Sequence, residues 1–223
     1  MVTALPAGMY TRRTAVGALV GLCTAALAGC SRLDEALDGE TLDEAAEPAA
    51  VEASAAAAAG FRQTTLTDRV YERTVEVAGE STGLRLRNWL ARYTPVAAAD
   101  GDPAVFALLT TPTITVAGRS ANPFRGFDRE RLLRAIVERT DTAPVTGVEA
   151  VGERTSTVLG DPVPVDVFRA DGTRNGTRLR LQAGDRTHDG DLLVFLCISP
   201  ASVDATEATD TLAAGITHPV ERP

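Results

Sequence analysis

The side chains with the clearest potential for metal or acid–base chemistry gather in one short stretch near residue 190. Asp185, His188, Asp189 and Asp191 place four oxygen or nitrogen ligands within seven residues. Such a set suits a hard cation that activates water, so one hypothesis is a cation-dependent hydrolase. The stretch lacks the regular aspartate spacing and the terminal glutamate of a calcium-binding loop. The polar tip of a hairpin in an acidic protein would show the same residues, and this second interpretation also stands.

Elsewhere the sequence lacks the common catalytic signatures. It has no phosphate-binding loop and no dinucleotide fingerprint, and Gly118–Asn122 lacks the second glycine of a G-x-S-x-G nucleophile turn. The two histidines, His188 and His218, are 30 residues apart, and neither has a ligand partner at helical spacing. We therefore expect no catalytic residue, no cofactor and no bound metal ion, and we expect a protein that is not an enzyme.

The beginning of the chain carries the pattern of an export signal. Arg12 and Arg13 precede an uncharged run of 16 residues, Thr14–Gly29. This run is shorter than the roughly 20 residues that a membrane-spanning helix needs. A positive start, a short apolar stretch and small residues before a cleavage point are typical of a signal peptide. The sequence therefore predicts a signal peptide over residues 1–29, and the paired arginines indicate the twin-arginine route.

Cys30 follows this signal directly, and the run Leu27-Ala28-Gly29-Cys30 resembles a lipobox. We predict that Cys30 is lipidated and becomes the first residue of the mature protein, anchored outside the cell. The alternative is an ordinary signal peptide cut near Ala28, with an accidental cysteine behind it. Cys23 would leave with the signal, and Cys197 would then stand alone, so the mature chain would form no internal disulfide. Cys197 lies in an apolar run, which predicts a small buried side chain.

The composition excludes one class of partner. The chain has 22 basic and 30 acidic residues, a net charge of −8, and every basic residue is arginine. This negative charge argues against nucleic acid, whose binding needs a basic surface. An acidic chain without lysine is typical of extracytoplasmic proteins from salt-loving archaea. A bacterium with an arginine-biased, GC-rich genome would explain it as well.

Charge density also predicts how the chain is divided. The segment after Cys30, residues 31–46, holds six acidic residues and one arginine. Such a segment stays solvated rather than packing into a core. We therefore expect a lipidated cysteine and acidic tether over 30–46. Residues 47–223 are about the length of one domain.

The pattern of elements within residues 47–223 predicts the fold class. Helices are expected at 48–59 (an alanine-rich linker being the alternative), at 128–137 and at about 204–214. Strands are expected at 70–77, 84–93, 104–111, 114–117, 155–159, 163–170, 177–181 and 191–199, with Asp-Gly and Asn-Gly turns among the later ones. The order of helix, four strands, helix, four strands, helix predicts an α+β fold. In it, a largely antiparallel sheet of about seven to eight strands carries packed helices.

Three weaker features point to surfaces rather than to catalysis. Trp89 and Tyr93 share a strand face with neighbouring arginines, which fits either a ligand surface or a half-covered core edge. The loop 118–127 carries two phenylalanines and is either a docking edge or a cap over the sheet. Asn175 lies in an Asn-Gly-Thr sequon at a predicted turn and is a candidate for N-glycosylation.

Several short motifs together resemble a known pattern. They are Arg12-Arg13, Leu27-Ala28-Gly29-Cys30, Pro48-Ala49 with Gly60-Phe61, Asn88-Trp89, the strand Phe106–Pro112, Gly118 and Asn122-Pro123. On these residues the chain resembles an uncharacterised family of predicted twin-arginine-exported lipoproteins from halophilic archaea. That family has no assigned catalytic or binding residues, so the resemblance transfers none. More remotely, the element order is similar to the α+β sandwich of PsbP-like and Mog1-like proteins, which implies an accessory or binding role by analogy of fold.

The sequence thus predicts a membrane-anchored extracytoplasmic lipoprotein. We expect a non-catalytic binding or accessory module of the cell envelope that contacts the membrane through the lipid on Cys30. Its expected partner is another envelope protein or a small ligand, and not nucleic acid. The alternatives are the cation-dependent hydrolase built on residues 185–191 and a passive component of the envelope.

Overall fold

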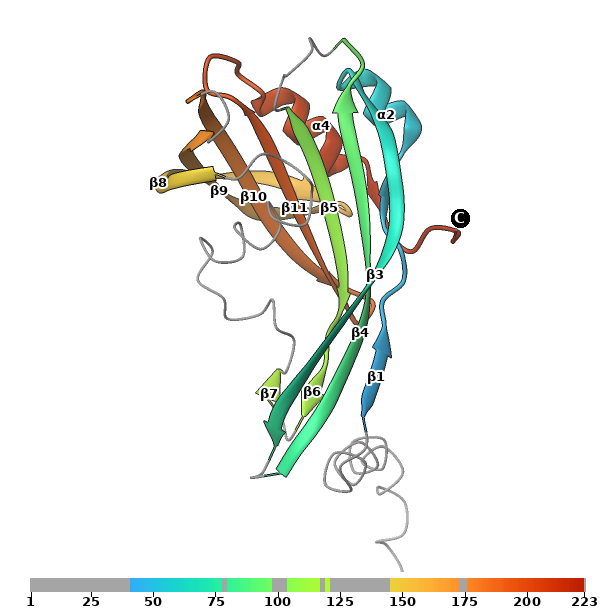
Figure 1. Ribbon diagram of the computed structural model, residues 1–223. Coiled ribbons are helices and arrows are strands. Elements are labelled where there is room, and N and C mark those ends of the chain that lie inside the picture. The colour runs from blue at the N-terminus through green and yellow to red at the C-terminus, as the bar shows by residue number, and fades with distance from the viewer. Residues whose placement is uncertain are drawn as a thin grey trace, which may run out of the picture.

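The computed structural model of the chain describes residues 41–77, 80–97, 104–116, 119–120, 145–172 and 176–222. Within these ranges one large sheet dominates, with two short helices on one of its faces (Figure 1). The predicted signal peptide, the lipidated cysteine and most of the tether lie outside the described residues. The predicted helix over 128–137, most of the loop 118–127 and Asn175 lie outside them too.

The large sheet is built from eight strands in the described residues. These are β1 (Leu42–Ala45), β3 (Phe61–Val77), β4 (Glu80–Pro95), β5 (Val105–Pro112), β8 (Val145–Val158), β9 (Asp161–Gly172), β10 (Arg178–His188) and β11 (Asp191–Pro200). Two small pairs accompany it: β2 (Ala50–Val51) with β12 (Ile216–Thr217), and β6 (Thr115–Val116) with β7 (Arg119–Ser120). The helices are α2 (Ala53–Ala58) and α4 (Thr206–Ala214).

The strand order is β1-β4-β5-β11-β10-β9-β8, and β3 pairs with the remaining edge of β4. The strands β1 and β5 share one edge of β4, since β1 pairs with Leu84–Arg87 and β5 with Trp89–Tyr93. The β1–β4 pair is parallel, whereas the other strand pairs of this sheet are antiparallel. The described sheet is therefore mixed.

The apolar composition of the central strands accounts for their burial. Every residue of β5 is buried, and β11 is buried from Asp191 to Ser199. A continuous apolar run such as Leu192–Ile198 is expected where both faces of a strand are covered. The strands β10 and β11 are joined by Asp189 and Gly190, both with positive φ (47° and 85°), as a two-residue primed turn requires.

Two buried clusters lie on the two faces of this sheet. Beneath the helices, the rings of Phe106 and Phe195 stack with centroids 5.8 Å apart, and Tyr93 meets Phe106 edge-on. The opposite face carries a second cluster of apolar side chains: Leu90, Val105, Ala107, Leu109, Phe168, Ala170, Leu179, Leu181, Leu192, Val194, Leu196 and Ile198. Each large apolar side chain that is fully buried stabilises the fold by roughly 1.5–3 kcal/mol.

The long hairpin of β3 and β4 gives the molecule its shape. Its strands have 17 and 16 residues and run well past the other strands toward β1 (Figure 1). Their ladder extends from Phe61 paired with Pro95 to Val77 paired with Glu80, with one bulge between Gln63 and Thr65. Beyond the end of β5, the four-residue strand β1 is the neighbour of β4 on its other edge.

The predicted α+β class is wrong, because the described residues are mostly strand. The helices α2 and α4 have only six and nine residues and lie against each other on one face of the sheet. The predicted strands were too short, since β8 begins at Val145 and β3 at Phe61. Antiparallel partners extended them, because pairing satisfies the backbone of residues whose own side chains show no clear period.

The N-terminal part of the domain also differs from the expectation. The predicted helix over 48–59 shrinks to α2, because Ala50 and Val51 pair with β12 instead. Residues Leu42–Ala45 form β1, although they fall inside the predicted tether. Leu42 is buried against Leu84, which outweighs the acidic composition around it. By contrast, α4 lies close to its predicted place, and the Asp204 carboxylate accepts a hydrogen bond from the Thr206 N–H at its start.

Candidate functional site

Two segments far apart in the sequence cross the helix-bearing face of the sheet together. We call residues 46–51 the crossing segment and residues 216–222 the C-terminal segment. They pair through β2 and β12, and the Val220 N–H donates to the Pro48 carbonyl at 2.9 Å. Because both segments pass over the hairpin of β10 and β11, they bring their side chains onto its polar end.

Trp89 and Tyr93 hold the crossing segment on the sheet. The Trp89 indole N–H donates to the Ala46 carbonyl at 3.1 Å, and the Tyr93 hydroxyl accepts from the Val51 N–H at 2.7 Å. Both rings are buried. Burial raises the pKa of Tyr93, and the hydrogen bond from Val51 opposes that rise. Of the two interpretations of this pair, the structure favours core residues over a ligand surface.

The polar end of the β10–β11 hairpin contains both histidines of the chain. His188 ends β10, and His218 comes from the C-terminal segment just after β12. Their Nδ1 atoms are 3.2 Å apart, and their rings are nearly perpendicular, at 80°. His218 Nε2 donates to Asp191 Oδ2 at 3.1 Å, so the three side chains form one line from the buried carboxylate to the partly exposed ring of His188.

Asp191 anchors this line. Its Oδ2 atom also accepts a hydrogen bond from the Glu47 N–H at 2.8 Å. The side chains of His218 and Asp191 are only 1% and 9% exposed. The Glu47 carboxylate in turn receives two hydrogen bonds from the Arg222 guanidinium, at 2.7 and 3.3 Å. Asp191 thus fixes the crossing segment to the hairpin through the Glu47 backbone and the C-terminal segment through the His218 ring.

Only part of the predicted four-residue cluster comes together. His188 and Asp191 are directly opposite in the β10–β11 ladder and point to the same face. Asp185 lies three residues before His188 on β10 and is exposed on the other face. Asp189 lies in the turn, with its carboxylate 3.5 Å from His188 Nδ1. The four side chains therefore do not surround one cation.

Sequence reasoning missed His218 as a member of this site. It lies 27 residues from Asp191 and 30 from His188, outside any local spacing rule. The small number of histidines was the available signal. Because the chain has only two, any pair of imidazole side chains in it must join His188 to His218. The pairing of β12 with β2 brings His218 to His188, and no local pattern in residues 216–222 predicts that pairing.

The tautomers of the two rings follow from their partners. Because His218 Nε2–H donates to a carboxylate, its Nδ1 carries a lone pair when the ring is neutral. His188 either donates its own Nδ1–H to that lone pair or presents a second lone pair. The first arrangement leaves His188 Nε2 as the outer acceptor of a proton.

A second polar cluster fastens α4 to the sheet. The Arg154 Nε–H donates to Gln182 Oε1 at 2.9 Å, and Gln182 Nε2 donates to the Thr209 hydroxyl at 3.1 Å. Arg154 also pairs with Asp210 of α4. Cys197 lies fully buried beside this cluster, and burial raises its pKa to about 11, against the opposing effects of Thr209 and Arg154. A thiol in this state is a packing group rather than a nucleophile.

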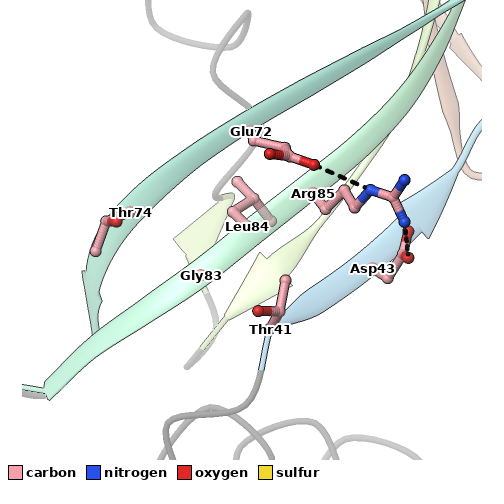
Figure 2. Close-up of a pocket in the computed structure, with 7 residues that line it drawn as sticks. All are labelled: Thr41, Asp43, Glu72, Thr74, Gly83, Leu84 and Arg85. Atoms are coloured by element: carbon pink, nitrogen blue, oxygen red, sulfur yellow. Dashed lines mark hydrogen bonds and ion pairs between the residues drawn. The ribbon is translucent and has the colours of Figure 1, made fainter.

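An open pocket of about 690 Å³ lies at the far end of the long hairpin (Figure 2). Its lining comes from β1 and the residue before it, and from β3 and β4: Thr41, Asp43, Glu72, Thr74, Gly83, Leu84 and Arg85. The Arg85 guanidinium bridges Asp43 and Glu72, each at 3.2 Å, across three neighbouring strands. Among the described residues that line the pocket, the cation is Arg85, and it is paired with two carboxylates. These two ion pairs attach β1 to the hairpin of β3 and β4.

The outer side of β3 has no strand partner in the described part of the chain. From Thr65 to Val77 the ladder to β4 is regular, and no described strand pairs with the other side of β3. Two acidic side chains of β3 form ion pairs with arginines of β4. Asp68 Oδ2 lies 3.9 Å from Arg87 Nε, and Glu72 pairs with Arg85. The opposite sheet edge, β8, is interrupted by two register shifts, between Thr146 and Glu149 and between Ala150 and Gly152.

Two further observations concern membranes and metals. Among the described residues, neither helix reaches the length and apolarity that crossing a membrane requires. Nor, in that part of the chain, do three or more His, Cys, Asp or Glu side chains stand ready as a set of metal ligands.

Comparison with known families adds the remaining finding. Residues 48–217 match the family described as a domain of unknown function (DUF6517). The chain belongs to this family. The DUF6517 match covers both helices, the sheet from β3 onward, His188 and Asp191, and it ends one residue before His218. The strand β1 also precedes its first residue. No curated protein matches the chain.

Proposed function

We propose that this DUF6517 protein is a lipid-anchored, extracytoplasmic binding module of the cell envelope. It is held by the lipid on Cys30, and it takes up an extended segment of another envelope protein along the outer edge of β3. The outer side of β3, with which no described strand pairs, is the observation that carries the proposal. The resemblance to exported lipoproteins of halophilic archaea supports the location.

The edge of β3 suits strand addition for two reasons. Thirteen residues, Thr65–Val77, follow the bulge in regular antiparallel register with β4, so every second residue directs its backbone N–H and C=O away from β4. A peptide strand can satisfy such groups by main-chain hydrogen bonds. Sheet edges are usually protected by charges or bulges. Here Asp68 and Glu72 pair with arginines of β4 and Arg69 stays exposed on the strand, whereas β8 is interrupted by two bulges.

The anchor places this edge near the membrane. Eleven peptide steps join Cys30 to Thr41, where the described chain begins. They span at most about 40 Å when fully extended. From there β1 pairs with Leu84–Arg87 of β4, which pair on their other side with Val70–Arg73 of β3. A partner embedded in or bound to the envelope is therefore within reach of the hairpin.

The hydrolase alternative has less support. Asp185 lies on the face opposite His188, and Asp191 already accepts hydrogen bonds from Glu47 and His218. The remaining pair, His188 and Asp189, is too small a set to hold a hard cation that activates water. The binding proposal needs none of these side chains.

Site-directed photocrosslinking in living cells tests the proposed edge. Val70 on β3 and Val203 in the turn after β11 are exposed to similar extents, 45% and 50%. We expect a benzophenone amino acid at position 70 to crosslink one defined envelope protein through an extended segment. The same group at position 203 should yield no such product.

A third position separates the two edges of the sheet. Val151 on β8 is 41% exposed and serves as the matched site on the other edge. A crosslinked product at position 151 and not at 70 would contradict the proposal for β3. Products of equal yield at 70 and 203 would indicate nonspecific contact and contradict it as well.

A further inference from the structure

The separation of the two histidine nitrogens is the starting observation. His188 Nδ1 and His218 Nδ1 are 3.2 Å apart, with nearly perpendicular rings whose centroids are 5.4 Å apart. Two imidazole nitrogens bound to one zinc ion at 2.0–2.1 Å, at a tetrahedral angle, are about 3.3–3.4 Å apart. The pair therefore has the spacing of two ligands on a single ion.

The second observation is the carboxylate behind His218. Histidines that bind metal ions commonly donate their other ring N–H to a carboxylate, which orients the ring and raises its basicity. Asp191 does this for His218 at 3.1 Å, and it is itself fixed by the Glu47 N–H. Since both side chains are almost fully buried, the lone pair on His218 Nδ1 is held in place toward His188.

The electrostatic repulsion between the two facing Nδ1 atoms gives a third reason. If His188 also presents a lone pair at Nδ1, two lone pairs face each other at 3.2 Å and repel. Either a proton on His188 Nδ1 or a cation removes this repulsion. A divalent ion stabilises both lone pairs at once, whereas a proton leaves one ring as the acceptor.

A third ligand is within reach. The Asp189 carboxylate lies 3.5 Å from His188 Nδ1, and its side chain is 70% exposed. In the structure this carboxylate contacts His188 and does not complete a set of three ligands. Rotation of the exposed side chain would bring a carboxylate oxygen toward the ion, and water would complete the coordination from the solvent side. Imidazole with one carboxylate suits zinc, copper or nickel rather than calcium or magnesium.

From these observations we propose that His188, His218 and Asp189 bind one divalent transition-metal ion of the zinc or copper type. The site joins the C-terminal segment to the β10–β11 hairpin. Because a bound ion favours the folded chain, it stabilises that junction. The site lies apart from the edge of β3 and does not depend on partner binding there.

Metal titration of the purified full chain tests this site. We expect one equivalent of Zn²⁺ to bind and to raise the thermal midpoint of unfolding. With Cu²⁺ in its place, electron paramagnetic resonance should show two coupled imidazole nitrogens. Since the chain has only two histidines, this signature reports on His188 and His218 whatever the cysteines bind.

Variants on the same hairpin supply the controls. His188→Gln, at a partly exposed position, should keep the fold and remove one of the two imidazole couplings. Asp191→Asn should weaken Zn²⁺ binding about ten- to hundredfold, because it removes the carboxylate that orients His218. Asp189→Asn keeps a residue that tolerates the positive φ of the turn and should weaken binding as well. Asp185→Asn, which removes a carboxylate from the other face of β10, should change nothing.

Two results would overturn the proposal. One is a Cu²⁺ spectrum of the unaltered chain without imidazole coupling. The other is a Zn²⁺ dissociation constant that is the same in His188→Gln as in the unaltered chain. Either result would mean that the two rings share only a hydrogen bond.

Discussion

Cys197 shows how its position, and not its residue type, decides what a side chain does. The thiol lies fully buried on β11 beside Thr209 of α4. Burial raises its pKa from 9.0 to about 11, since the thiolate would lose its hydration there. The sequence interpretation of Cys197 as a small buried side chain agrees with this environment.

Alkylation of Cys197 should therefore be slow in the folded chain. At pH 8 the thiolate fraction of a thiol with a pKa of about 11 is roughly a hundredfold lower than at a pKa of 9.0. Iodoacetamide labelling, read by mass spectrometry on the peptide that contains Cys197, should be at least that much slower than in urea-unfolded protein. Equal rates in the two states would show that the thiol is exposed or activated.

At the scale of elements, the contact between the two helices depends on one glycine. Gly215 ends α4, and a Cβ built there would lie 2.3 Å from the Cβ of Ala55 in α2. The Ala55 methyl group cannot rotate away, because it is attached directly to the helix backbone. The helices must therefore separate if residue 215 carries a side chain.

Gly215→Ala should destabilise the fold by about 1–3 kcal/mol through this overpacking. Gly152→Ala is the matched control, because a Cβ at Gly152 in β8 meets nothing within 4 Å. The control should stay within about 0.5 kcal/mol of the unaltered chain. Urea unfolding of both variants measures the difference, and equal losses would contradict the tight helix contact.

At the scale of the whole molecule, the domain and its proposed anchor make separate contributions. The described domain has its own core on both faces of the sheet, and the crossing segment ties its beginning to its end. Attachment to the membrane is proposed to depend on Cys30 alone. Loss of the lipid should therefore change the location of the protein without unfolding it.

Cys30→Ser should release the protein from the membrane fraction into the medium of its native host. Cys23→Ser is the matched control, because Cys23 lies inside the predicted signal peptide and should leave the anchor intact. Cell fractionation with immunoblotting measures both variants. Membrane retention of Cys30→Ser, or release of both variants alike, would contradict lipidation at Cys30.

Local sequence patterns were sufficient to predict several single elements of the fold. The apolar run Leu192–Ile198 is a buried strand, the Asp189–Gly190 pair is a hairpin turn, and the last helix ends at Gly215. These features depend on neighbouring residues only. The signal peptide and the lipid on Cys30 stay predictions of the same local kind.

By itself, then, the sequence determined particular elements, such as the buried strand Leu192–Ile198 and the Asp189–Gly190 turn, and the charge that the molecule carries. The tertiary structure alone decided that the described residues are mostly strand, that β1 pairs in parallel with β4, and that His218 meets Asp191 and His188. The physical reason is that these features depend on backbone hydrogen bonds and side-chain contacts between distant residues. Alternation and spacing describe one segment at a time, and they do not say which other segment completes it.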